Sequence, residues 1–175
     1  MSLLRFLGIG DKDGDSGAAE TATVRAIASR LERLDAETSR FLAGFAYVLA
    51  RAANADLEIA EEEADEMRRA VHELAELGSE ETDLVVEIAK SQARLLGGTE
   101  NYVVTREFRK HSTREQRVKL LACLYAVAAA DGTISGEESG EIRAIAEELG
   151  FTRAEANAYR SRYREQLSLL RPDAD

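Results

Sequence analysis

The feature that most constrains the fold is an acidic segment that occurs twice, 75 positions apart. One copy spans Ala53 to Glu63 and the other spans Ala128 to Glu138. In each copy alanines end an apolar helical pattern, an aspartate begins a short turn, and glutamates begin the next helical pattern. The sequence therefore predicts two copies of one helix–acidic turn–helix unit. The aligned positions are Asp56 and Asp131, Ile59 and Ile134, Glu62 and Glu137, Glu63 and Glu138, and Met67-Arg68 and Ile142-Arg143.

The rest of the chain favours an all-α fold. Its 175 residues are 45% apolar and include one proline, so the chain can bury a sizeable core and its helices are seldom interrupted. Apolar residues recur at helical spacing, and no stretch shows the alternation of a half-buried strand. We expect helices over about 18–34, 36–53, 61–77, 80–96, 102–110, 113–130, 135–149 and 152–170.

Several residues mark where these helices begin and end. Serine, threonine or aspartate just before a helix can accept a hydrogen bond from its free N–H groups, and a Glu or Gln three residues later completes a capping box. Glycine after a helix takes the left-handed conformation that ends it. The predicted N-caps are Asp35 and Ser79, the predicted capping boxes are Thr113 with Gln116, Ser135 with Glu138, and Thr152 with Glu155, and the predicted terminating glycines are Gly78, Gly132 and Gly150.

The first 17 residues differ from the rest of the chain and are expected to lie outside the helical domain. Leu3 to Ile9 form a short apolar segment, and residues 11–17 form an acidic linker that we expect to be flexible. The linker imitates the start of a calcium-binding loop, but Ala22 stands where that loop needs a glutamate. We therefore expect residues 18–175 to form a single helical domain.

The charge and composition of the chain limit which classes of partner it can bind and in which cellular compartment we expect it. A net charge of −10 disfavours binding to nucleic acid and to anionic membranes. No apolar run is long enough to span a membrane, no signal peptide is recognisable, and the lone Cys123 cannot form an internal disulfide. These observations indicate a cytoplasmic protein with a protein partner, while peripheral membrane contact and homo-oligomerisation stay open.

The acidic turns are candidate metal sites. The segment from Asp131 to Glu138 has the spacing of the second half of an EF-hand loop, but Val127 and Ala129 stand where the first two ligands belong. One copy therefore cannot enclose an ion, whereas two copies brought together by the fold can share one. The candidate ligands are Asp56, Glu63, Asp131 and Glu138, with Glu58 and Glu62 as further possibilities. Their oxygen atoms suit Ca²⁺, Mg²⁺ or Mn²⁺.

A purely structural interpretation of the same residues stays open. Glutamates in the first turn of a helix are stabilised by the helix dipole without any ligand. Each aspartate can form a local turn through a hydrogen bond to a following backbone N–H. The turns would then only connect and cap helices.

No other set of residues predicts an enzyme. Cys123 lies in the most apolar helix, so we expect a buried thiol, and we expect His72 and His111 at the surface. No catalytic residues and no organic cofactor are predicted. Four arginines near the C-terminus can bind an anionic partner, pair with the acidic turns, or simply solvate helix faces: Arg153, Arg160, Arg162 and Arg164.

The repeated turn resembles that of the TerB-like family, named for a tellurite-resistance protein. The resemblance covers about residues 41–164 and is strongest in the second copy, where an apolar helix leads into Ala-Asp-Gly-x-Ile-Ser-x-x-Glu. The first copy departs from this pattern at Leu57, in place of Gly, and at Ala60, in place of Ser. The resemblance implies a helical bundle of about seven to eight helices in two pseudo-symmetric halves. It also implies that the acidic-turn positions bind a divalent cation.

The resemblance implies a non-enzymatic bacterial module related to tellurite and stress resistance. Two alternatives stay open: a metal-dependent enzyme that uses the carboxylate cluster, and a purely structural protein-interaction domain. The family also supplies domains of membrane-anchored J-domain co-chaperones. Because the only proline, Pro172, is not part of a His-Pro-Asp motif, we do not expect co-chaperone activity here.

Overall fold

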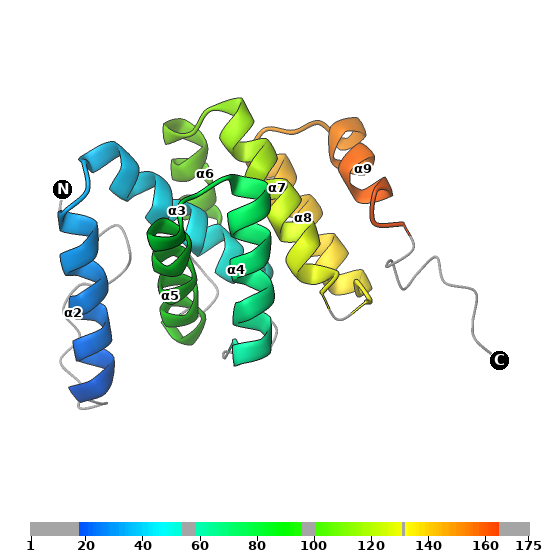
Figure 1. Ribbon diagram of the computed structural model, residues 1–175. Coiled ribbons are helices and arrows are strands. Elements are labelled where there is room, and N and C mark those ends of the chain that lie inside the picture. Colours follow the sequence, from blue (N-terminus) through cyan, green and yellow to red (C-terminus); the bar gives the residue numbers. More distant parts are fainter. Residues whose placement is uncertain (1–17, 54–58, 96–100, 131, 165–175) are drawn as a thin grey trace.

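The computed structural model describes residues 18–53, 59–95, 101–130 and 132–164, and this part of the chain forms eight α-helices and no strand (Figure 1). The all-α fold predicted from the sequence is therefore confirmed. None of these helices is long and apolar enough to cross a membrane. The helices are α2 (Ala18–Glu32), α3 (Ala36–Ala52), α4 (Glu61–Ala75), α5 (Ser79–Leu95), α6 (Asn101–His111), α7 (Arg114–Ala128), α8 (Gly136–Glu148) and α9 (Arg153–Ser161).

The helices of both copies share one core. Helix α3 packs against α5 and α6, and α4 packs along α7, so elements from the two halves of the sequence interlock. Helix α2 lies at one edge against α5, and α9 lies at the other edge against α8 and α7 (Figure 1). The largest fully buried side chains come from α2, α3, α4, α5, α7, α8 and the turn before α8: Leu31, Leu42, Phe45, Leu49, Met67, Ile88, Leu120, Leu121, Leu124, Tyr125, Ile134 and Ile142.

Most of the predicted helix ends are confirmed. The Asp35 side chain accepts hydrogen bonds from the N–H groups of Glu37 and Thr38, at 3.0 and 2.9 Å. Gly132 and Gly150 have φ angles of 87° and 86°, so both adopt the left-handed conformation expected after a helix. The three predicted capping boxes form, at Thr113 with Gln116, Ser135 with Glu138, and Thr152 with Glu155.

The connection between α4 and α5 differs from the prediction. Helix α4 ends before Gly78, and Glu76 takes the left-handed conformation with a φ of 57°. Lys119 of α7 donates to the exposed Glu76 carboxylate at 2.7 Å. The prediction of Ser79 as an N-cap is wrong, because Ser79 is already the first residue of α5. Instead, the preceding Gly78 N–H donates to Glu81 at 3.0 Å.

Helix α9 is shorter than expected. It ends at Ser161 rather than continuing toward residue 170, because the chain tightens into i→i+3 hydrogen bonds, including Arg162 N–H to Tyr159 and Tyr163 N–H to Arg160. The Ser161 hydroxyl also donates to the Ala158 carbonyl at 2.8 Å. This turn stacks the ring of Tyr163 on that of Tyr125, with 5.5 Å between ring centroids.

A buried ion-pair cluster joins α3, α6 and α8. Arg51 of α3 is 8% exposed and donates to Glu141 at 2.6 Å and to both carboxylate oxygens of Glu148 at 2.6 and 3.1 Å. It also donates to the Thr105 hydroxyl of α6 at 3.0 Å. Burial lowers the pKa of the Arg51 guanidinium, but the hydrogen bonds to Glu148 and Glu141 outweigh this effect and raise the pKa overall. Arg51 therefore stays charged and links three helices.

Helices α3 and α6 approach closely at Gly44. The rings of Phe41, Phe45 and Phe108 pack around this contact, with centroids 5.7 to 6.4 Å apart. A Cβ atom on Gly44 would lie 2.7 Å from Cδ2 of Phe108, which is too close for two carbon atoms. The absence of a side chain at Gly44 thus allows this aromatic cluster to form.

We expect Gly44→Ala to lower the free energy of unfolding by about 1–3 kcal/mol, because Phe108 must move to admit the new methyl group. The matched control is Gly140→Ala, since a Cβ at Gly140 meets nothing within 4 Å. The control should gain up to about 1 kcal/mol from the better helix propensity of alanine. Urea unfolding measures both changes. Equal stability of the two variants would contradict the close approach of α3 and α6.

We expect Arg51→Met to destabilise the protein by about 3–5 kcal/mol, because it leaves the Glu148 carboxylate poorly solvated and unpaired. The control is Arg69→Met, which removes an exposed ion pair with Glu66 and should cost at most about 1 kcal/mol. Thermal and urea unfolding compare the two variants. A loss for Arg51→Met no greater than that of the control would show that the cluster contributes little.

Candidate functional site

The two acidic turns precede α4 and α8. Glu63 and Glu138 are the third residues of these helices and occupy equivalent places in the two copies. Glu62 is exposed on the first turn of α4. The other candidate ligands, Asp56, Glu58 and Asp131, lie outside the described residues.

Each of the two equivalent glutamates caps its own helix. Glu63 Oε2 accepts a hydrogen bond from the Ala60 N–H at 2.8 Å, and Glu138 Oε2 accepts one from the Ser135 N–H at 2.8 Å. In the second copy the Ser135 hydroxyl also accepts from the Glu138 N–H at 3.1 Å. Alanine has no hydroxyl group, so the first copy forms only half of this capping box. In both copies one carboxylate oxygen binds the backbone, and the other forms no hydrogen bond with the described residues.

Two equivalent isoleucines anchor the turns to the core. Ile59 is 6% exposed and Ile134 is 1% exposed. Eight residues further along the chain, Met67 and Ile142 are equivalent and fully buried. The buried positions of the two copies therefore match, which supports the register of the repeat that the sequence predicts.

Oxygen ligands at these positions suit a hard divalent cation, but the described residues supply only part of a coordination shell. Among residues 18–53, 59–95, 101–130 and 132–164, no three His, Cys, Asp or Glu side chains gather closely enough to hold a metal ion. Glu63 and Glu138 can each give one oxygen without losing their capping hydrogen bonds. The remaining ligands must then come from Asp56, Glu58 or Asp131.

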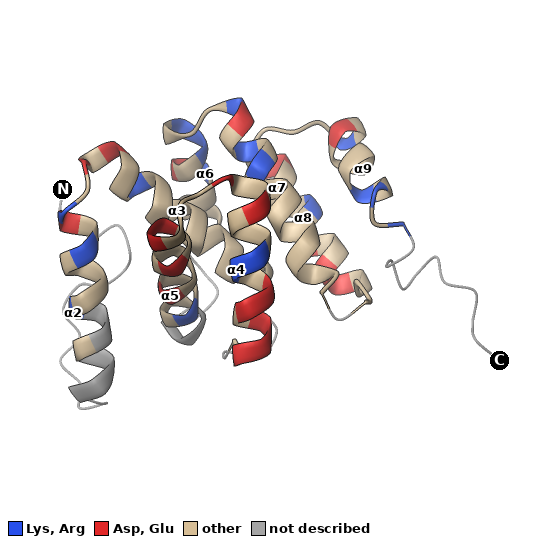
Figure 2. Cartoon of the chain, viewed as in Figure 1, with Lys and Arg blue, Asp and Glu red and all other residues tan. Residues whose placement is uncertain are grey.

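The acidic face of α4 is partly neutralised by neighbouring cations (Figure 2). Lys90 of α5 forms an ion pair with Glu61, and its hydrogen bond lowers the pKa of the Glu61 carboxyl. On α4 itself, Arg68 pairs with Asp65 at 2.6 Å, and the next arginine pairs with Glu66 at 2.8 Å. These exposed pairs explain how a run of carboxylates is tolerated without a ligand.

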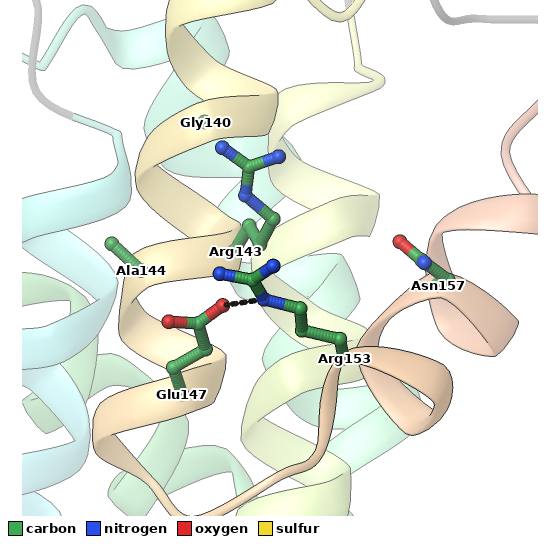
Figure 3. A pocket seen from close by; sticks show the side chains of 6 residues that line it. All are labelled: Gly140, Arg143, Ala144, Glu147, Arg153 and Asn157. Atoms are coloured by element: carbon green, nitrogen blue, oxygen red, sulfur yellow. Dashed lines mark hydrogen bonds and ion pairs between the residues drawn. The ribbon is translucent and has the colours of Figure 1, made fainter.

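A groove of about 500 Å³ lies between α8 and α9 (Figure 3). Arg143 and Glu147 line it from α8, and Arg153 and Asn157 line it from α9. A smaller hollow of about 190 Å³ shares part of this lining and adds Arg160.

Sequence reasoning included a pairing of the C-terminal arginines with the acidic turns among its alternatives. Among the described residues, the arginines in and just after α9 contact other groups instead. Arg153 contacts Glu147 at 3.3 Å and remains 86% exposed, while Arg160 donates to the Ser139 hydroxyl at 2.9 Å. Arg162 lies over the ring of Tyr159, 4.9 Å from its centroid. Sequence reasoning missed Arg143, although its alignment with Arg68 in the repeat was visible.

The lone cysteine and the two histidines lie where the sequence places them. Cys123 is fully buried, and its thiol donates to the Ala70 carbonyl at 3.5 Å. Burial raises the pKa of this thiol to about 12, so it is not a nucleophile in the folded protein. His72 and His111 are both exposed. The predictions for these three residues are confirmed.

Comparison with known protein families identifies a match over most of the described residues. The family model described as Tellurite resistance protein TerB matches residues 42–161. These residues include both helix–turn–helix copies and end with α9. No curated protein and no solved structure matches the chain significantly.

We expect Cys123 to resist labelling by a thiol reagent at about pH 8, because the reactive thiolate is scarce and the side chain is buried. Guanidinium-unfolded protein should react fully under otherwise equal conditions. Absorbance of the released chromophore measures both rates. Rapid labelling of the native protein would contradict the burial of Cys123 in the core.

Proposed function

The chain belongs to the TerB family, and from this premise we propose that it is a non-enzymatic module that binds a divalent cation through its two acidic turns. The family description names tellurite resistance, and we propose that the module acts in that process or in a related stress response. The candidate ligands are those that the repeat aligns: Asp56 with Asp131, and Glu63 with Glu138.

The observation that carries this proposal is the equivalent placement of Glu63 and Glu138. Both follow an acidic turn, both begin a helix that is anchored by a buried isoleucine, and both commit one oxygen to the backbone. Two carboxylates presented in the same way by two copies suit a shared cation. A bound cation would supply positive charge between the turns and offset the repulsion between their carboxylates.

The capping hydrogen bonds also define the competing function. If the two glutamates only cap α4 and α8, the turns are structural and the module acts by binding proteins alone. The two functions differ in one respect that can be measured. A cap requires an acceptor oxygen, whereas a cation ligand of this kind requires negative charge.

Glu→Gln substitutions separate these two requirements. Glutamine caps a helix in this very chain, where Gln116 accepts from the Thr113 N–H at 2.8 Å. Glu63→Gln and Glu138→Gln should therefore keep both helices intact while removing the charge. Asp131→Asn tests the turn itself in the same manner. Glu73→Gln, an exposed change on α4 away from the turn, is the control for a lost negative charge.

We expect calorimetric titration of metal-free protein to give saturable heat with Ca²⁺, Mg²⁺ or Mn²⁺. Each of the three site variants should weaken binding by about tenfold or more, because affinity depends on the number of charged ligands. Glu73→Gln should bind as the wild type does. Absence of saturable heat with every ion would overturn cation binding, and unchanged affinity in all three site variants would overturn the assignment of these residues.

A further inference from the structure

The groove between α8 and α9 carries an excess of positive charge in an otherwise acidic protein. Arg143, Arg153 and Arg160 line the groove and its adjoining hollow, where Glu147 is the acidic residue among the described lining side chains. The chain as a whole has a net charge of −10. Figure 3 shows the guanidinium groups of Arg143 and Arg153 next to each other over α8, with that of Arg153 directed toward Glu147 and with Asn157 on the α9 side.

The cations in this groove are incompletely neutralised. Within the part of the chain that the structure describes, Arg143 has no hydrogen-bonding or ion-pairing partner, and Arg153 has only the 3.3 Å contact with Glu147. Arg160 binds a neutral hydroxyl, that of Ser139, which is itself 6% exposed. Near these arginines lies the buried Tyr125 hydroxyl, which has no hydrogen-bond partner among the described residues. Burial raises the pKa of Tyr125, and the positive charges of Arg160 and Arg143 oppose that change.

The floor of the groove gives a ligand close access to α8. Gly136, Gly140 and Ala144 are spaced four residues apart and so lie along one face of the helix. A Cβ at Gly140 would meet nothing within 4 Å, which shows that this face is open. Large apolar side chains are missing from the described lining, so the groove does not suit an apolar ligand.

We propose that this groove binds an acidic segment of a partner protein, with Arg143, Arg153 and Arg160 holding its carboxylates. Guanidinium groups bind carboxylates through paired, charge-assisted hydrogen bonds, and three of them along an open groove match several acidic residues of an extended chain. Nucleic acid needs a broad basic face, whereas here the positive charge is confined between two helices of an acidic protein. This proposal does not depend on cation binding at the turns.

The test uses fluorescence anisotropy with the full chain and a labelled synthetic peptide of alternating Glu and Ser. A matched peptide with Gln in place of Glu controls for backbone binding. We expect saturable binding of the acidic peptide, little binding of the neutral one, and a loss of about tenfold in affinity for Arg143→Gln. Arg69→Gln removes the same charge from exposed α4 and should change the affinity by less than about twofold.

A gain of affinity provides a result that misfolding cannot imitate. Glu147→Gln removes the negative charge in the groove and releases Arg153, so it should tighten peptide binding roughly threefold. Failure of Glu147→Gln to tighten binding, or an equal loss in Arg143→Gln and Arg69→Gln, would overturn the proposal. Circular dichroism of each variant confirms that the helices are retained.

Three further measurements identify a different occupant. Inorganic phosphate that displaces the peptide at concentrations below that of the peptide would overturn the assignment to an acidic protein segment. Single-stranded DNA that binds more tightly than the peptide, and whose binding depends on Arg143, would overturn it as well. Sedimentation of the wild type and of Arg143→Gln tests a second copy of the chain. Self-association that is lost in Arg143→Gln would assign the groove to an interface between copies, and a monomer in both cases supports the proposal.

Discussion

The ion-pair cluster at Arg51 determines how the two halves of the chain fit together. A guanidinium that is 8% exposed destabilises the fold unless charged partners surround it, so α3 and α8 must adopt the register in which Glu141 and Glu148 both reach Arg51. These two glutamates are seven residues apart, about two helical turns, and lie on one face of α8. With this face held against α3 and α6, the adjacent face of α8 is left to form the groove with α9, and the N-terminus of α8 presents Glu138.

The capping boxes give the acidic turns a stable arrangement even without a ligand. A carboxylate that binds a backbone N–H keeps a fixed orientation. Its second oxygen can therefore bind a cation with little further loss of side-chain entropy. The same bond limits what that carboxylate can offer, because bidentate coordination would have to displace the backbone donor. Glu63 and Glu138 are thus better suited to single-oxygen coordination than the last glutamate of an EF-hand loop.

Local features could be predicted from the sequence, and long-range ones could not. The capping boxes at Thr113, Ser135 and Thr152 were recognisable because their partners are three residues apart. The role of Arg51 was not, because its acidic partners are 90 and 97 residues away. The left-handed Glu76 was missed because residues other than glycine seldom adopt this conformation. For the candidate site, the spacing of the acidic residues in the sequence was sufficient to identify them. The exposure of Arg143 could not be predicted, because it depends on how α9 packs against α8.

The two copies of the repeat use one equivalent arginine in opposite ways. Arg68 is paired with Asp65 at 2.6 Å and with Asp83 at 3.5 Å, whereas its counterpart Arg143 faces an open groove. Asp65 stands where the second copy has Gly140. Counted from the first residues of α5 and α9, the buried Val86 stands where the second copy has Arg160. In the first copy, α5 is enclosed against α3. In the second copy, Ala156 is the buried residue of α9, so substitutions in α9 should be tolerated by the fold far more readily than those in α5.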